Sequence, residues 1–104
     1  MLEQWTSQDF APHLHTIFRI GSPSAVELEL TEVVDRSNAR IDQFSLLFGG
    51  PLFPMLGQGT YMLEHTRMGE ISLFLVPLGP RNAQMIYQAV FTRLIQEPQA
   101  PQRA

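Results

Sequence analysis

Three histidines are the residues in this chain best suited to metal or acid–base chemistry. His13 and His15 are separated by one residue, and His65 follows Glu64 much later in the sequence. A zinc site needs three or four nitrogen or oxygen ligands at tetrahedral angles, so all three histidines would have to meet. His13 and His15 point to the same side only in an extended segment, whereas the residues before them predict a helical turn. We therefore interpret them as structural histidines. The alternative is a small metal-dependent enzyme, or a small-ligand-binding barrel, that uses His13, His15 and His65.

Two glutamates form the other arrangement that could support catalysis. Glu27 and Glu29 are two residues apart, which in a strand places them on one face about 6.5–7 Å from each other. Paired carboxylates at such a distance occur in inverting glycosidases. Here they are successive polar positions of an amphipathic strand, and nothing nearby supplies an apolar pocket. The pattern favours two solvated side chains.

The remaining motifs give no nucleophile and no phosphate site. The tripeptide Gly57-Gln58-Gly59 has glutamine where a nucleophile elbow needs serine. It also lacks the frame of a phosphate-binding loop and leads into a strand rather than a helix. We interpret it as a turn, with Gly59 at positive φ. The sequence thus predicts no catalytic residue, no metal and no cofactor.

The composition narrows the function further. The 104 residues are enough for one domain with its own core, 44% are hydrophobic and 16% are charged. The net charge of −3 opposes binding to nucleic acid or to an anionic membrane. There are no cysteines, which excludes disulfides and cysteine-based metal sites. The first residues lack the pattern of a signal peptide, so we expect a cytoplasmic protein.

The hydrophobic pattern predicts a mainly β protein. Val26, Leu28 and Leu30 alternate with polar residues, and the alternation breaks at Thr31 and Glu32, where a β-bulge would restore it. A capping sequence and Pro12 predict one short N-terminal helix at residues 7–13, anchored by Trp5 and Phe10. The expected fold is a small antiparallel β-barrel or roll of about six strands, in a single domain over residues 1–95. A Pro- and Gln-rich segment at 96–104 is predicted to be a disordered tail. The expected strands cover residues 16–20, 25–34, 43–48, 60–65, 70–76 and 85–94.

Residues 49–59 interrupt the strands with four glycines and two prolines. The segment also contains large apolar side chains, so we expect it to pack down as a lid over the barrel. A sugar or lipid ligand beneath this lid is a further possibility. The residues expected to form it are Leu52, Phe53, Met55 and Leu56.

The outer face of the last two strands carries apolar residues where a barrel with one core should be polar. Either the chain's own helix and loop cover this surface, or another chain does. We expect self-association or a protein partner here. The candidate interface residues are Phe74, Val76, Ile86 and Val90.

Four motifs together resemble a family of small bacterial proteins known as a domain of unknown function. They are QGTYMLEH at residues 58–65, LFLVPLGP at 73–80, YQAVFTR at 87–93 and FSLLFGGP at 44–51. Members of that family are associated with genes for phage-tail-collar-like or fibre-like proteins. The resemblance implies a structural or assembly role and supplies no catalytic residues. This chain has Gly49 where members commonly have a charged residue, which opposes a charge-based role for that loop.

The function that the sequence predicts is a non-enzymatic binding or assembly module, accessory to a phage-tail-like or fibre-like system.

Overall fold

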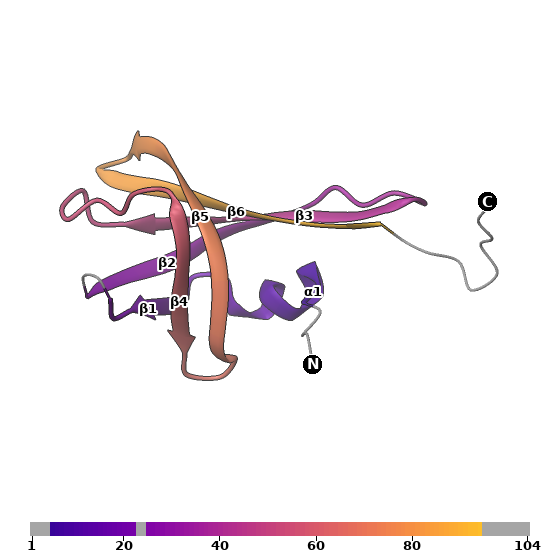
Figure 1. Ribbon diagram of the computed structural model, residues 1–104, viewed down its shortest axis with the longest axis horizontal. Helices are drawn as coiled ribbons and strands as arrows, with labels where there is room; N and C mark the ends of the chain where they lie inside the picture. The colour runs from indigo at the N-terminus through magenta and orange to yellow at the C-terminus, as the bar shows by residue number, and fades with distance from the viewer. Residues whose placement is uncertain (1–4, 23–24, 95–104) are drawn as a thin grey trace.

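Six strands and one short helical segment make up the computed structural model, which describes residues 5–22 and 25–94 (Figure 1). The predicted tail at 96–104 lies outside the described residues. Within them, no helix is both long and apolar enough to cross a membrane. The helical segment is α1 (Ser7–Phe10) followed by the 3₁₀ turn η1 (Ala11–His13), and the strands are β1 (Ile17–Ile20), β2 (Val26–Asp35), β3 (Ile41–Gly50), β4 (Gly59–His65), β5 (Gly69–Arg81) and β6 (Gln84–Leu94).

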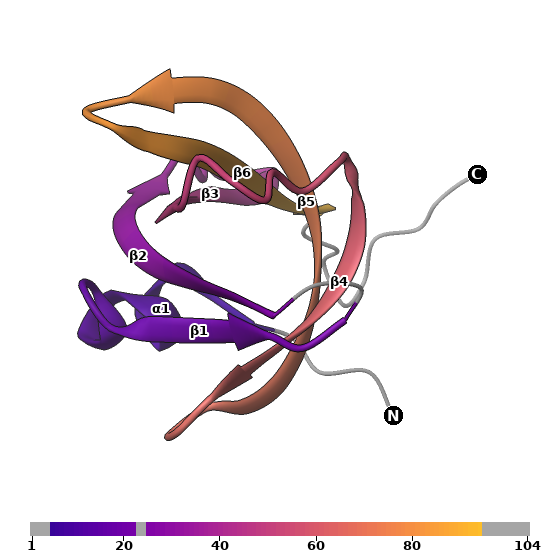
Figure 2. The ribbon, with the colours of Figure 1, turned by 90° about the vertical axis from the view of Figure 1, so that its left-hand side faces the viewer.

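The six strands form one antiparallel sheet that closes on itself. Their order around the ring is β1-β2-β3-β6-β5-β4, and β4 returns to pair with β1. Figure 2 shows the strands arranged around a common interior. This arrangement confirms the prediction of a mainly β, antiparallel barrel or roll of six strands with one short N-terminal helix.

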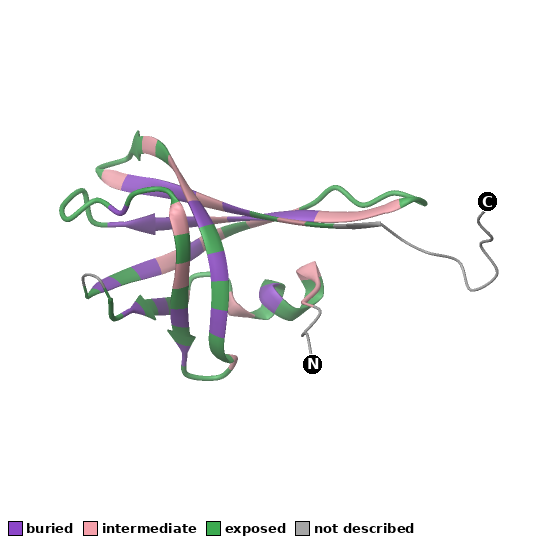
Figure 3. Cartoon of the chain, viewed as in Figure 1, coloured by how far each residue is buried: buried purple, intermediate pink, exposed green. Residues whose placement is uncertain are grey.

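Alternation along the strands produces the core. In β2 the residues Val26, Leu28 and Leu30 are buried and their neighbours are not, as the banding in Figure 3 shows. The register of β2 against β3 shifts between Leu30 and Glu32, which confirms the predicted bulge. The bulge lets β2 continue with Val33 partly buried against the core, because one extra residue restores the side-chain parity.

The paired strands β3 and β6 extend beyond the rest of the ring, and α1 lies beneath this extension (Figure 1). Phe44 of β3 and Phe91 of β6 stack with ring centroids 4.5 Å apart. Phe10 of α1 is fully buried against both of them, and Trp5 packs against Phe10 at 5.7 Å. The predicted anchoring of the helix through Trp5 and Phe10 is therefore confirmed.

Polar contacts fix where the helix begins. The Thr6 side chain accepts a hydrogen bond from the backbone N–H of Asp9, and the Asp9 carboxylate accepts one from the backbone N–H of Thr6. This capping box satisfies donors that a helix N-terminus otherwise leaves unpaired. The Ser7 hydroxyl donates to the Asp35 carboxylate at 2.6 Å, and this bond, the largest cause, lowers the pKa of Asp35. The helix start is thus joined to the end of β2.

Two details of the strands differ from the sequence prediction. Strand β5 does not end at residue 76 but continues through Pro77 and Pro80 to Arg81. Proline is tolerated there because β4 pairs with β5 only as far as Leu75, so this part of β5 has β6 as its sole neighbouring strand among the described residues. Gly59 begins β4 and is not among the glycines at positive φ.

Candidate functional site

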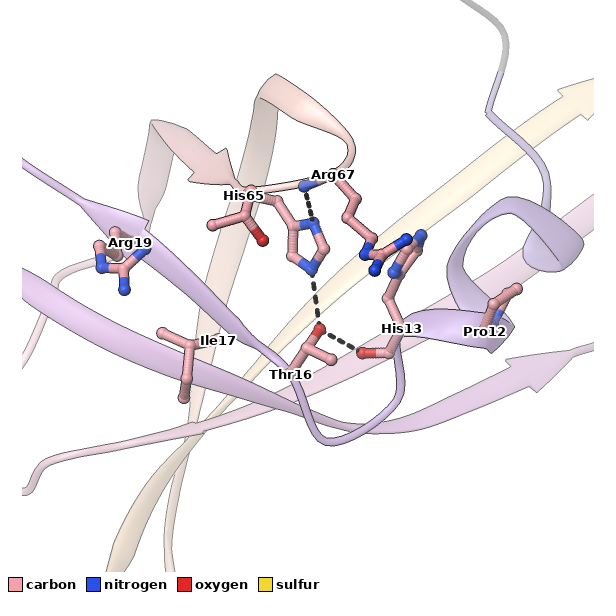
Figure 4. Close-up of a pocket in the computed structure, with 8 residues that line it drawn as sticks. Pro12, His13, Thr16, Ile17, Arg19, His65 and Arg67 are labelled. Atoms are coloured by element: carbon pink, nitrogen blue, oxygen red, sulfur yellow. Dashed lines mark hydrogen bonds between the residues drawn. The ribbon is translucent and has the colours of Figure 1, made fainter.

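A cleft of about 460 Å³ lies where η1, the start of β1 and the turn between β4 and β5 meet (Figure 4). The chain brings these segments together because β4 pairs with β1 to close the ring. Among the described residues, the lining is rich in basic side chains and contains no carboxylate. Its residues are Pro12, His13, Thr16, Ile17, Arg19, His65, Thr66 and Arg67.

His65 is fixed at the back of this cleft by both nitrogens of its ring. Its Nδ1 accepts hydrogen bonds from the backbone N–H groups of Arg67 at 3.0 Å and Met68 at 3.1 Å. Its Nε2 lies 2.8 Å from the hydroxyl of Thr16, and that hydroxyl donates to the carbonyl of His13 at 2.6 Å. Because the Thr16 hydrogen is already used, Nε2 must carry the proton and donate to Thr16. The ring is therefore a neutral imidazole whose tautomer is set by its neighbours.

The surroundings of His65 oppose its protonation. The side chain is 5% exposed and packs against Phe18 and His13, with ring centroids 4.4 and 4.6 Å away. Burial lowers the pKa of His65 below its ordinary value of 6.5, and the positive charges of His13 and Arg67 lower it further. His65 is thus a structural residue that holds the β4–β5 turn, as the sequence favoured.

The other basic residues of the cleft differ in how their charge is balanced. Arg19 contacts the Glu27 carboxylate at 3.3 Å, and Glu64 is its partner in the register between β1 and β4. Among the described residues, no ion pair or side-chain hydrogen bond involves the Arg67 guanidinium. Figure 4 shows His13 and Arg67 on the same side of the cleft and Arg19 on the other. The uncompensated positive charge is therefore on the side of His13 and Arg67.

His15 does not join the other two histidines. Its Nδ1 lies 2.8 Å from the Glu29 carboxylate on β2, and its backbone is in the left-handed region with φ of 67°. The three-histidine site of the alternative hypothesis is therefore wrong in its geometry, because the chain turns between His13 and Thr16. Over residues 5–22 and 25–94 there is no group of three or more histidines, cysteines or carboxylates that could hold a metal ion.

The outer face of β5 and β6 is apolar, as predicted, but not at all four candidate positions. Phe74 and Val90 are each 51% exposed, and Val76 is half-buried. Met62 of β4 is 52% exposed, although the sequence analysis did not include it. Met62 pairs with Ser72 of β5, and Phe74 lies two residues further along the same strand. Three apolar side chains on adjacent strands are thus largely exposed.

The prediction for Ile86 is wrong, because its side chain is only 7% exposed. Its partners on the two adjacent strands are Gly49 and Gly79, which have no side chains to hold it away from the sheet. The Gln84 side chain also lies directly over Gly49. Ile86 is therefore covered by its own chain and does not belong to the exposed surface.

Next to Phe74 and Val90 the ring opens into a fork. Strands β5 and β6 pair from the hairpin at Arg81 and Gln84 as far as Val76 and Gln88. Beyond that point β5 pairs with β4 and β6 pairs with β3. Among the described residues, β6 therefore has no strand partner on its β5 side from residue 89 to 94. We call this stretch the open edge of β6.

The expected lid packs down at one residue only. Leu56 is 3% exposed, and its backbone N–H donates to the hydroxyl of the buried Tyr87 at 2.8 Å. The other three side chains expected in the lid remain substantially exposed, at 38% for Leu52, 86% for Phe53 and 54% for Met55. The lid prediction is wrong for these three. The hydrogen bonds that hold the loop lie near its end, at Leu56 and at Gly57, whose carbonyl accepts from the Tyr61 hydroxyl at 2.7 Å.

A family model described as "Domain of unknown function (DUF6916)" matches residues 5–91, which include both the helix and all six strands up to Phe91. No curated protein and no solved structure matches the chain significantly. The chain therefore belongs to the family described as a domain of unknown function, DUF6916.

Proposed function

We propose that this chain is a non-enzymatic assembly module that pairs with a second copy of itself along the open edge of β6. The observation that carries the proposal is the fork between β5 and β6. There β6 loses its neighbouring strand on one side while Val90 on its outer face stays 51% exposed.

An open strand edge is a template for another strand, because it presents backbone N–H and C=O groups in a row. Proteins that avoid such pairing place charged residues or prolines on the edge. Within the open edge of β6, residues 89–92 are Ala, Val, Phe and Thr, with no charge and no proline, and Arg93 is the one charged residue. In antiparallel pairing about a two-fold axis between residues 90 and 91, the uncharged residues 89–92 of the two copies would face each other. The two Arg93 residues would then lie at opposite ends of the paired segment.

The apolar side chains beside the fork support the same conclusion. Phe74 and Val90 are the next outward residues after the last pair between β5 and β6, and Met62 lies on the adjoining strand. Complete burial of an apolar side chain of this size is worth about 1.5–3 kcal/mol relative to exposure. An interface that covered these three side chains would therefore add hydrophobic stabilisation to the strand pairing.

The proposal extends to the setting in which this module works. Tail-like and fibre-like structures are built from repeated subunits, and a two-fold dimer of this chain would be one such subunit. We therefore propose an accessory role in a phage-tail-like or fibre-like system.

The rival function, a small enzyme or ligand-binding barrel at the histidines, has less support. His65 uses both ring nitrogens within the protein, and His15 pairs with Glu29 outside the cleft. Of the three histidines, only His13 has no hydrogen bond from its ring within the described residues, and Arg67 lies on the same side of the cleft.

Light scattering coupled to size exclusion, over a range of protein concentrations, tests the assembly proposal. We expect the wild type to associate, and Phe74→Glu and Val90→Lys to be folded monomers by circular dichroism. Met55→Glu is the matched control, because Met55 is 54% exposed on the loop away from the fork and should not affect association. A wild type that is monomeric at every concentration would overturn the proposal, as would substitutions at Phe74 and Val90 that leave its mass unchanged.

A further inference from the structure

We propose that the cleft between η1 and the β4–β5 turn binds a small organic oxyanion, with Arg67 and His13 as the binding side chains. The ligand class is a carboxylate or a phosphate monoester that carries a small apolar group. This site is separate from the open edge of β6 and does not depend on the assembly proposal.

The charge of the cleft points to an anion. The chain as a whole carries a net charge of −3, yet the described lining of the cleft contains two arginines and His13, besides the neutral His65, and no carboxylate. Arg19 is partly neutralised by Glu27, whereas Arg67 has no acidic partner within the described part of the chain. A guanidinium group offers paired N–H donors that match the two oxygens of a carboxylate or phosphate.

The hydrogen bonds of His65 hold this arrangement in place. The backbone N–H of Arg67 donates to His65 Nδ1, so the residue that carries the free guanidinium is held by its main chain. The carbonyl of His13 is held through Thr16, which also accepts from His65 Nε2. One buried ring thus positions both proposed binding residues, while its own nitrogens are unavailable to a ligand.

His13 and Arg67 lie on the same side of the cleft, next to His65 (Figure 4). Both His13 and Arg67 lower the pKa of His65 through their positive charge. The ring of His13 is also 4.6 Å from that of His65. A bound oxyanion near His13 and Arg67 would therefore lie beside basic side chains, in a cleft whose described lining has no carboxylate.

The size and the remaining lining define the rest of the ligand. A volume of about 460 Å³ lies within the range of small-molecule sites, roughly 300–1,000 Å³. Pro12 and Ile17 add apolar surface, and Ile17 is 37% exposed. A ligand with one acidic group and one small ring or alkyl group would use both parts of the cleft.

Nuclear magnetic resonance titration of the ¹⁵N-labelled protein tests this proposal with three probes at constant ionic strength. The probes are benzoate, phenyl phosphate and the uncharged benzyl alcohol. We expect saturable shifts at residues 12–19 and 65–68 with at least one of the two anions and not with benzyl alcohol. The tighter of the two anions identifies the acidic group that the site prefers.

Two arginine substitutions provide the comparison. We expect Arg67→Gln to weaken anion binding at least tenfold. Arg81→Gln, at the exposed β5–β6 hairpin and outside the described lining of the cleft, should change it less than twofold. The same spectra report whether each variant is folded. The absence of saturable shifts with both anions, equal shifts with benzyl alcohol, or full binding by folded Arg67→Gln would each overturn the proposal.

Discussion

Replacement of His65 offers a quantitative test of the way this structure is held together at the β4–β5 turn. His65 Nδ1 accepts from the N–H groups two and three residues later in the chain. Asn38 forms the same pattern in another turn, where its side-chain oxygen accepts from the N–H groups of Arg40 and Ile41. The histidine ring therefore accepts the same two backbone hydrogen bonds as the asparagine of an Asx turn. Its other nitrogen also forms a hydrogen bond with the Thr16 hydroxyl. Asparagine at position 65 should preserve the first task and lose the second.

The magnitudes follow from counting these hydrogen bonds. His65→Phe keeps the size and apolar character of the ring but removes three hydrogen bonds, each worth roughly 0.5–1.5 kcal/mol. Because Arg67 is exposed and water can reach its N–H, we expect a total loss of about 3 kcal/mol in unfolding free energy. His65→Asn removes the bond to Thr16 and the packing of the ring against Phe18, at a cost of about 1.5 kcal/mol. Thr16→Val, which removes the same bond from the other side, should cost about 1 kcal/mol.

The dependence on pH gives a second, independent signature. The pKa of His65 is lowered in the folded protein, so the unfolded chain takes up a proton more readily than the folded one. The contribution of His65 to the unfolding free energy is therefore complete at a pH well above 6.5, the ordinary pKa of histidine. It is lost as the pH falls from 6.5 towards the lowered pKa of the folded protein. The stability advantage of the wild type over His65→Asn should shrink over that same range.

Urea unfolding followed by far-ultraviolet circular dichroism measures all of these differences. The variants His65→Phe, His65→Asn and Thr16→Val are compared with the wild type at pH 8, and the wild type and His65→Asn again at pH 5.5. Equal stability of the Phe and Asn variants would refute the role assigned to the turn. A pH-independent difference between wild type and His65→Asn would refute the neutral state assigned to the ring.

Two further substitutions test features of the strands. Gly50→Ala should destabilise the protein by about 1–3 kcal/mol, because the new Cβ would lie 2.5 Å from Cδ2 of the fully buried Leu28. Gly57→Ala is its control, since nothing lies within 4 Å of that position; similar urea midpoints for the two variants would contradict the packing argument. Ala83→Gly should raise the unfolding free energy by about 0.5–1 kcal/mol, because Ala83 has φ of 65° in the two-residue β5–β6 turn. A fall in its thermal midpoint would show that this turn is not strained.

The sequence predicts those parts of the structure that depend on local pattern. The helical segment at residues 7–13, the inward positions of β2 and the bulge after Leu30 all follow from side-chain parity and capping, which neighbouring residues determine. The continuation of β5 past Pro77 could not be predicted in this way. It depends on which strands lie on either side of β5, and that is a property of the whole sheet.

The sites show the same division. The exposure of Phe74 follows from alternation along one strand, but the burial of Ile86 follows from glycines on two other strands. The cleft was missed because Thr16 and His65 are 49 residues apart in sequence and meet only when the ring closes. The sequence did contain one signal for the position of His65. It directly precedes the turn before Gly69, and a side-chain acceptor at such a position can accept hydrogen bonds from the backbone N–H groups two and three residues later.

The closure of the ring also has a consequence for the order of events in folding. Among the described residues, the strand pairing of β1 with β4 is limited to Arg19 with Glu64 and Ile20 with Leu63, whereas β3 and β6 pair along almost their whole lengths. The closing contact links residues more than forty positions apart, so the entropic cost of closing this loop is high. Only a few hydrogen bonds between the strands offset that cost, and they form only after the loop has closed. We expect the hairpins to form first and this seam last. In the native state, amide hydrogens of β1 should then exchange faster than those of β3, because the seam is the place where the ring opens with least loss of structure.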